Sequence, residues 1–197
     1  MAPMLHIVPP LARGYRVGVV IIAQGTPFQV TVRDARERGP WATMSEHPIE
    51  GRKRTIIYHH TAGGVPAKRS MREEIDLLEM MRNTSPWGLP YNFVVMPAPP
   101  FRVYYLNDVA GCWPHTWDHN CDTAIAAYGN FERDKPDQRL VDMMLRLGDA
   151  LAEMWGEWLR EAQHRDFIPT SCPGQHLSPL LPSLGKQRGI DYNGPTG

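Results

Sequence analysis

One long segment with a regular apolar stripe limits how this chain can fold. Between residues 137 and 163, apolar side chains recur at alternating spacings of four and three residues, at Leu140, Met144, Leu147, Leu151, Met154 and Trp158. That spacing predicts an α-helix with one apolar face over the whole segment. Because such a face has to pack against other apolar surface, we assign the stripe to the core and not to a cofactor site.

Three short runs bounded by turn residues supply strands on which such a helix can pack. They are LPYNFVVM (89–96), FRVYYLN (101–107) and DTAIAAYGN (122–130). A second helix is predicted in PAKRSMREEIDLLEMMRN (66–83), with Pro66 in its first turn and a stop at Asn-Thr-Ser-Pro. The order of these elements predicts an α/β fold, in which a mixed central β-sheet is flanked by helices.

The first 50 residues have a different pattern. In YRVGVVIIAQGTPFQVTVRDA (15–35), two runs of alternating apolar residues flank a break at AQGTP, and their apolar positions are Val17, Val19, Ile21, Phe28, Val30 and Val32. Alternation on both sides of a turn predicts a β-hairpin. We therefore expect an N-terminal β-hairpin extension over residues 1–50, followed by one domain of catalytic size over 51–180 and an irregular tail over 181–197.

The charge balance and the hydropathy exclude two classes of partner. The chain has 21 basic and 21 acidic residues and a pI near 7.1, so we expect no nucleic-acid partner. No run approaches the roughly 20 apolar residues of a membrane span. Prolines interrupt MAPMLHIVPPLARG where a signal peptide would have its apolar segment, so we expect synthesis in a cytoplasm without a signal peptide.

The cysteines constrain the redox chemistry. Cys112, Cys121 and Cys172 are an odd number, so at least one thiol is free. For Cys112 and Cys121 we expect reduced, partly buried thiols, and a disulfide across the short loop between them is the alternative.

Histidines and a cysteine offer the ligands of a catalytic zinc ion, which typically takes three protein ligands and leaves a fourth position for water. His164 and Cys172 lie eight residues apart in a loop stiffened by prolines. His59 or His60, from the strand-like run RTIIYHHTAGG (54–64), would be the third ligand. Successive strand side chains point to opposite faces, so only one of the two faces the ion, and the periodicity leaves open which.

Four motifs carry a resemblance to a known family. They are IIYHHTAGG, LPYNFVV, PHTWDHNCDTAIAAYGNFE and HRDFIPTSCPGQHL, in that order, over about residues 54–178. They resemble, in turn, the first zinc strand, the tyrosine strand, the groove segment and the closing zinc loop of zinc-dependent N-acetylmuramoyl-L-alanine amidases. These enzymes belong to the type 2 amidase and peptidoglycan-recognition-protein superfamily, which includes phage endolysins. The resemblance implies the fold of that superfamily.

The resemblance also implies roles for individual residues. His59, His164 and Cys172 would bind Zn²⁺. Tyr91 would lie beside the reacting water, and Thr170 would contact the carbonyl that is attacked. The implied substrate contacts are His115, Asn120, Trp87 and His60. For His60, packing against the other face of the strand is the alternative.

The implied activity is zinc-dependent hydrolysis of the amide between N-acetylmuramic acid and L-alanine in peptidoglycan. A phage-type lysin would be made in a host cytoplasm and act on the bacterial cell wall. Another class of function is a non-catalytic peptidoglycan-binding or phage-assembly module of the same fold, with the N-terminal hairpin docking on a phage or protein partner. The presence of both Cys172 and Tyr91 favours the enzyme.

Overall fold

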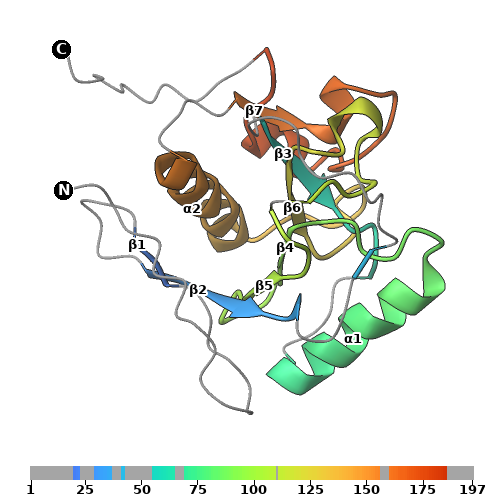
Figure 1. The fold of residues 1–197 in the computed structure, drawn as a ribbon, viewed down its shortest axis with the longest axis vertical. Helices are drawn as coiled ribbons and strands as arrows, with labels where there is room; N and C mark the ends of the chain where they lie inside the picture. The colour runs from blue at the N-terminus through green and yellow to red at the C-terminus, as the bar shows by residue number, and fades with distance from the viewer. Residues whose placement is uncertain are drawn as a thin grey trace.

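A seven-stranded mixed sheet with a helix on each face forms the centre of the molecule (Figure 1). The computed structural model describes residues 20–22, 29–36, 41–42, 55–64, 69–109, 111–155 and 160–185. The strand order is β1-β2-β5-β4-β6-β3-β7. The strands are β1 Val20–Ile22, β2 Gln29–Asp34, β3 Thr55–His60, β4 Phe93–Val95, β5 Val103–Tyr105, β6 Thr123–Ala127 and β7 Arg160–Gln163.

Parallel pairing dominates the half of the sheet that positions the site. β3 pairs parallel with both β6 and β7, and β6 pairs parallel with β4. β4 and β5 pair antiparallel, which makes the sheet mixed. The predicted α/β class and the three predicted central strands are therefore confirmed.

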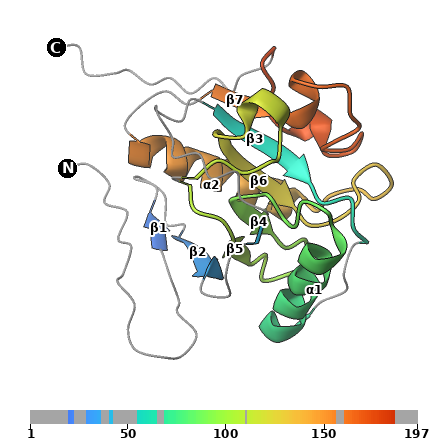
Figure 2. The same cartoon turned by 45° about the vertical axis from the view of Figure 1, so that its right-hand side comes forward.

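The two helices cover opposite faces of the sheet, as both views show (Figures 1 and 2). Helix α2 (Gln138–Trp155) packs on one face, where its stripe residues Leu140, Met144, Leu147 and Leu151 are buried. Helix α1 (Met71–Thr84) packs on the other face through Ile75 and Leu78. No helix in the described ranges has the length and apolar composition needed to cross a membrane.

The prediction that the helix with the apolar stripe, α2, continues to residue 163 is wrong. The helix ends at Trp155, and residues 160–163 form β7, in which Ala162 pairs with Ile57 and Gln163 with Tyr58. Tertiary pairing with β3 overrides a periodicity that is only local. The side chain of Met154 and all of Trp158 lie outside the described residues.

The predicted start of α1 is also wrong. The helix begins at Met71, and Ser70 caps it: its hydroxyl accepts from the Glu73 amide at 3.3 Å, and the Glu73 carboxylate accepts from the Ser70 amide at 2.7 Å. This reciprocal pair is a capping box, a signal that the sequence carries as Ser-x-x-Glu. Pro66 lies outside the described residues. The predicted stop is confirmed, with Ser85 as C-cap.

The N-terminal hairpin is present, and it extends the sheet. β1 pairs antiparallel with β2, and β2 then pairs parallel with β5, with Val32 opposite Val103. The indole of Trp41 is fully buried and donates to the carbonyl of Ala35 at 2.9 Å. Val17, Val19 and Phe28 lie outside the described residues, and the domain boundaries at residues 50 and 180 remain predictions.

Candidate metal centre

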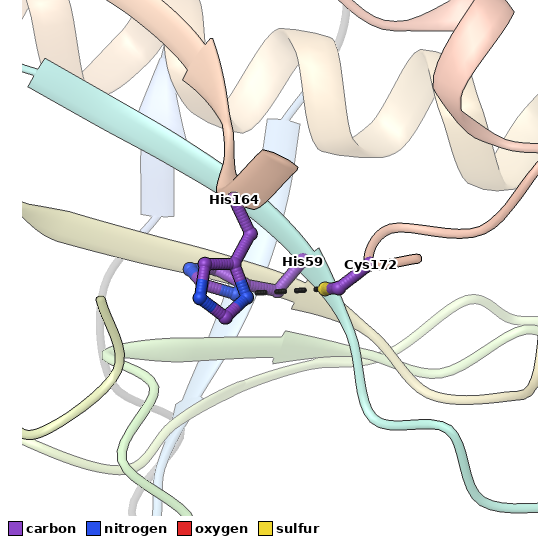
Figure 3. Close-up of side chains that lie close together, drawn as sticks. All are labelled: His59, His164 and Cys172. Atoms are coloured by element: carbon purple, nitrogen blue, oxygen red, sulfur yellow. Dashed lines mark hydrogen bonds between the residues drawn. The ribbon is translucent and has the colours of Figure 1, made fainter. Parts of the chain in front are cut away.

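Three side chains from separate parts of the sequence meet at the carboxyl ends of two parallel strands (Figure 3). His59 lies near the end of β3, His164 directly follows β7, and Cys172 lies in the loop beyond it. Their ligand atoms all lie within 4.8 Å of one another. The His59 Nδ1 atom is 3.7 Å from the Cys172 Sγ atom, and the two imidazole centroids are 4.6 Å apart. Because β3 and β7 are parallel neighbours, their ends deliver these groups to one edge of the sheet.

Side chains alternate between the two faces of β3, and it is His59, not His60, that faces the metal site. The ring of His60 points to the opposite face, where its Nδ1 accepts a hydrogen bond from the Phe131 amide at 3.2 Å and the ring is buried. This placement favours the packing alternative for His60 over a substrate contact. The backbone of His60 still serves the site, since its amide donates to the Cys172 sulfur at 3.3 Å.

The chemistry of these three side chains fits a zinc ion. The Nε2 atom of His164 is buried and has no hydrogen-bond partner within the described part of the chain. Burial lowers the pKa of His59 well below its usual value, with smaller contributions from the neighbouring histidines, and burial also lowers the pKa of His164. Both rings are therefore neutral, which is the form that binds a metal.

The thiol completes a nitrogen and sulfur ligand set. Burial raises the pKa of Cys172 to about 12, so without a cation nearby the sulfur keeps its proton at neutral pH. A coordinated cation stabilises the thiolate instead. Two imidazoles and one thiolate suit Zn²⁺ and leave its fourth position open.

The loop that carries Cys172 is held by its own hydrogen bonds. The Cys172 amide donates to the Thr170 hydroxyl oxygen at 3.2 Å, and the Arg165 guanidinium donates to the Ser171 carbonyl at 3.1 Å. Gly174 has φ +101°, a left-handed conformation that favours glycine. Thr170 thus lies in the ligand loop, with its hydroxyl hydrogen available to donate.

Tyr91 lies beside the cluster, just before β4. Its ring centroid is 5.2 Å from that of His59, and its hydroxyl donates to the His60 carbonyl at 3.4 Å. Burial and the nearby Cys172 raise the pKa of Tyr91 above its usual value. The phenol therefore keeps its proton, which suits a hydrogen-bond donor and not a base.

A loop between β5 and β6 covers the other nitrogen of His59. The Nε2 atom of His59 is 3.2 Å from Nδ1 of His115 and 3.3 Å from Oγ1 of Thr116. His115 is buried, so its placement beneath the His59 ring does not support the predicted contact with a substrate groove. Asn120 closes the loop by accepting from the Thr116 amide at 3.0 Å. Sequence reasoning missed Thr116, although it directly follows His115 in the groove motif.

A disulfide joins Cys112 to Cys121 across this loop, so the expectation of reduced thiols is wrong. The loop returns on itself, with the Trp113 amide donating to the Asn120 carbonyl at 2.8 Å, and brings the two cysteines together. Cys172 keeps a free thiol, as the odd number predicted.

Two tryptophans in the described part of the chain have exposed side chains. Trp87, a predicted substrate contact, is 60% exposed on the connection between α1 and β4. Trp117, which sequence reasoning did not select, is 77% exposed in the disulfide loop. The substrate role of Trp87 stays a prediction.

Comparison with known proteins identifies the fold. The sequence matches no protein-family model and no curated protein. Among solved structures, Drosophila peptidoglycan recognition protein SD matches over 77% of this chain and 92% of its own chain, with 19% identity and a TM-score of 0.60. The N-acetylmuramoyl-L-alanine amidase LysC of Clostridium intestinale matches with 20% identity, 76% and 94% coverage and a TM-score of 0.56. An endolysin of a Thermus scotoductus bacteriophage matches with 24% identity, 73% and 92% coverage and a TM-score of 0.54.

At these identities the likeness establishes the fold. The chain has the fold that peptidoglycan recognition proteins share with N-acetylmuramoyl-L-alanine amidases, as its motifs predicted.

Proposed function

We propose that this protein is a zinc-dependent N-acetylmuramoyl-L-alanine amidase that cleaves the bond between N-acetylmuramic acid and L-alanine in peptidoglycan. The observation that carries the proposal is the meeting of His59, His164 and Cys172 within 4.8 Å at the carboxyl edge of the sheet. The fold supports it, because two solved neighbours are named as amidases of this specificity. Another neighbour was solved in complex with a monomeric diaminopimelic acid-type peptidoglycan.

The residues around the proposed ion have separate roles. A zinc ion held by these ligands would supply a Lewis acid for the substrate carbonyl and lower the pKa of a water at its open position. Thr170 accepts from the Cys172 amide and keeps its O–H to donate to the substrate's carbonyl oxygen as negative charge develops there. Tyr91, kept protonated by burial, orients the attacking water or donates to the same oxygen.

The proposed setting is the bacterial cell wall. An endolysin is among the solved neighbours, which supports a phage-type lysin. The Cys112–Cys121 disulfide supports action in the periplasm or at the wall, because disulfides persist in oxidising compartments. Docking of the N-terminal hairpin on a phage or protein partner remains a proposal from the sequence.

Peptidoglycan binding without cleavage is the second candidate function. Peptidoglycan recognition proteins among the solved neighbours favour it. The complete ligand set and Tyr91 favour the enzyme.

The test is release of peptides with new L-alanine amino termini from purified peptidoglycan. We expect release by the wild type, none by Cys172→Ser, and none after chelation until zinc is restored. Metal analysis should find one zinc per wild-type chain and loss of that zinc in Cys172→Ser. Circular dichroism shows whether the variant is folded, and co-sedimentation with sacculi reports binding. A wild-type protein that holds zinc and binds sacculi but releases no alanine termini would establish the binding module instead.

A further inference from the structure

The side of His59 that faces away from Cys172 is enclosed by a short chain of polar groups. His115 and Thr116 are both buried against this ring. The Thr116 hydroxyl lies 2.9 Å from His115 Nδ1 and 3.3 Å from His59 Nε2. At the far end of this series of polar groups, His115 Nε2 lies 3.1 Å from the backbone carbonyl oxygen of Asp122.

The carbonyl of Asp122 sets the direction of the hydrogen bonds. A carbonyl oxygen only accepts, so Nε2 of His115 is the donor. In the neutral form of the His115 ring, one nitrogen carries the hydrogen and the other accepts. Nδ1 of His115 is therefore an acceptor, and two groups that can donate to it lie within hydrogen-bond distance: the Thr116 hydroxyl at 2.9 Å and the His59 ring at 3.2 Å.

Both arrangements give the same result for His59. In the first, the Thr116 hydroxyl donates its one hydrogen to His115, so its oxygen can only accept in the 3.3 Å contact with His59, and the hydrogen of that contact is on Nε2. In the second, His59 Nε2–H donates directly to Nδ1 of His115 at 3.2 Å. In each arrangement the hydrogen of His59 is on Nε2, so the lone pair is on Nδ1, the nitrogen 3.7 Å from the Cys172 sulfur.

We propose that His115 and Thr116 are positioning residues. Together with the Asp122 carbonyl they form a hydrogen-bond relay, which fixes the hydrogen of His59 on Nε2 and leaves the lone pair of Nδ1 directed toward the metal site. Histidine ligands usually donate their second ring nitrogen to such an outer partner, and loss of that partner typically weakens metal binding 10- to 100-fold. The consequence for zinc rests on the proposed function, whereas the tautomer of His59 does not depend on an ion.

The Cys112–Cys121 disulfide closes the loop that carries the two positioning residues. Both positioning residues lie within the closed loop, and Asp122 directly follows Cys121. The loop is also tied across its base by the Trp113 amide, which donates to the Asn120 carbonyl. The relay is therefore built into a closed loop and presented as a unit to the end of β3.

Two matched pairs of variants separate the hydrogen bond from the packing. Asparagine and leucine have nearly the same shape, and the side-chain oxygen of asparagine can replace the accepting Nδ1 atom. We compare His115→Asn with His115→Leu, and Thr116→Ser with Thr116→Val. The probe is Zn²⁺, whose dissociation constant is measured by competition with a chromophoric chelator.

We expect His115→Leu to weaken zinc binding by 10- to 100-fold and His115→Asn by only a few-fold. Thr116→Val should weaken binding less than His115→Leu, because His59 can donate directly to His115, and Thr116→Ser should be close to wild type. Equal losses in folded His115→Asn and His115→Leu would overturn the proposal, since the packing of the ring would then explain both. Wild-type affinity in His115→Leu would overturn it as well.

A second measurement reads the tautomer without an ion. Two-bond nitrogen–proton correlation spectra of zinc-free, ¹⁵N-histidine-labelled protein should show the Nε2–H tautomer for His59, and a mixture of tautomers in His115→Leu. An Nδ1–H tautomer in the wild type would overturn the relay. A wild type with the Nε2–H tautomer that binds no zinc would refute the proposed function and leave the relay standing.

Discussion

Replacing Gly174 with alanine tests whether the loop after β7 holds Cys172 in place. Gly174 has φ +101°, and a Cβ atom there would overlap backbone atoms of Phe131 and lie 2.6 Å from the Glu132 amide nitrogen. A left-handed conformation costs a non-glycine residue about 1–2 kcal/mol. Displacement of packed atoms by an added carbon costs about 1–3 kcal/mol more. We therefore expect Gly174→Ala to lower the free energy of unfolding by at least about 2 kcal/mol.

Thermal denaturation of the zinc-free protein measures this loss. For a chain of this size, 2 kcal/mol corresponds to a fall in Tm of roughly 4–8 °C. Gly185→Ala is the matched control, because a Cβ atom at Gly185 meets nothing within 4 Å, and we expect a change within about 0.5 kcal/mol. Zinc affinity should fall in Gly174→Ala as the loop moves. A Gly174→Ala protein as stable as its control, with unchanged zinc affinity, would refute this account of the loop.

Three further predictions concern the disulfide, pH and the surface. The double variant Cys112→Ser/Cys121→Ser should lose about 2.5–3 kcal/mol of unfolding free energy in denaturant titrations without reductant, from the entropy of its short loop; an unchanged midpoint would contradict this. The zinc-free protein should be most stable between about pH 6.5 and 9: below this range unfolding lets the buried histidines take up protons, and above it unfolding lets Cys172 release one. Denaturant titrations across pH check this, and Cys172→Ser should remove the loss between about pH 9 and 10, below the pH at which buried tyrosines with raised pKa values, Tyr91 among them, begin to contribute. Trp87→Ala should raise the KM for peptidoglycan several-fold at unchanged Tm, and an unchanged KM would exclude Trp87 as a substrate contact.

Local patterns predicted most of the elements and missed those that depend on distant partners. The apolar stripe of α2 is buried at Leu140, Met144, Leu147 and Leu151, because a helix with one apolar face has one way to bury it. The same periodicity extended the helix wrongly through residues 160–163. Those residues form β7 because β3 offers an open edge for pairing, and no local pattern contains that information.

In the candidate site, too, some features follow from local sequence and others depend on distant segments. The sequence by itself determined the donor types of the metal site and the order of the four motifs, and strand alternation required that His59 and His60 face opposite ways. Only the tertiary structure decided that the Cys112–Cys121 loop folds under His59 and buries His115 and Thr116 against its second nitrogen. The physical reason is range: helical and strand periods follow from neighbouring residues, whereas a hydrogen-bonded relay depends on which distant segments the sheet brings together.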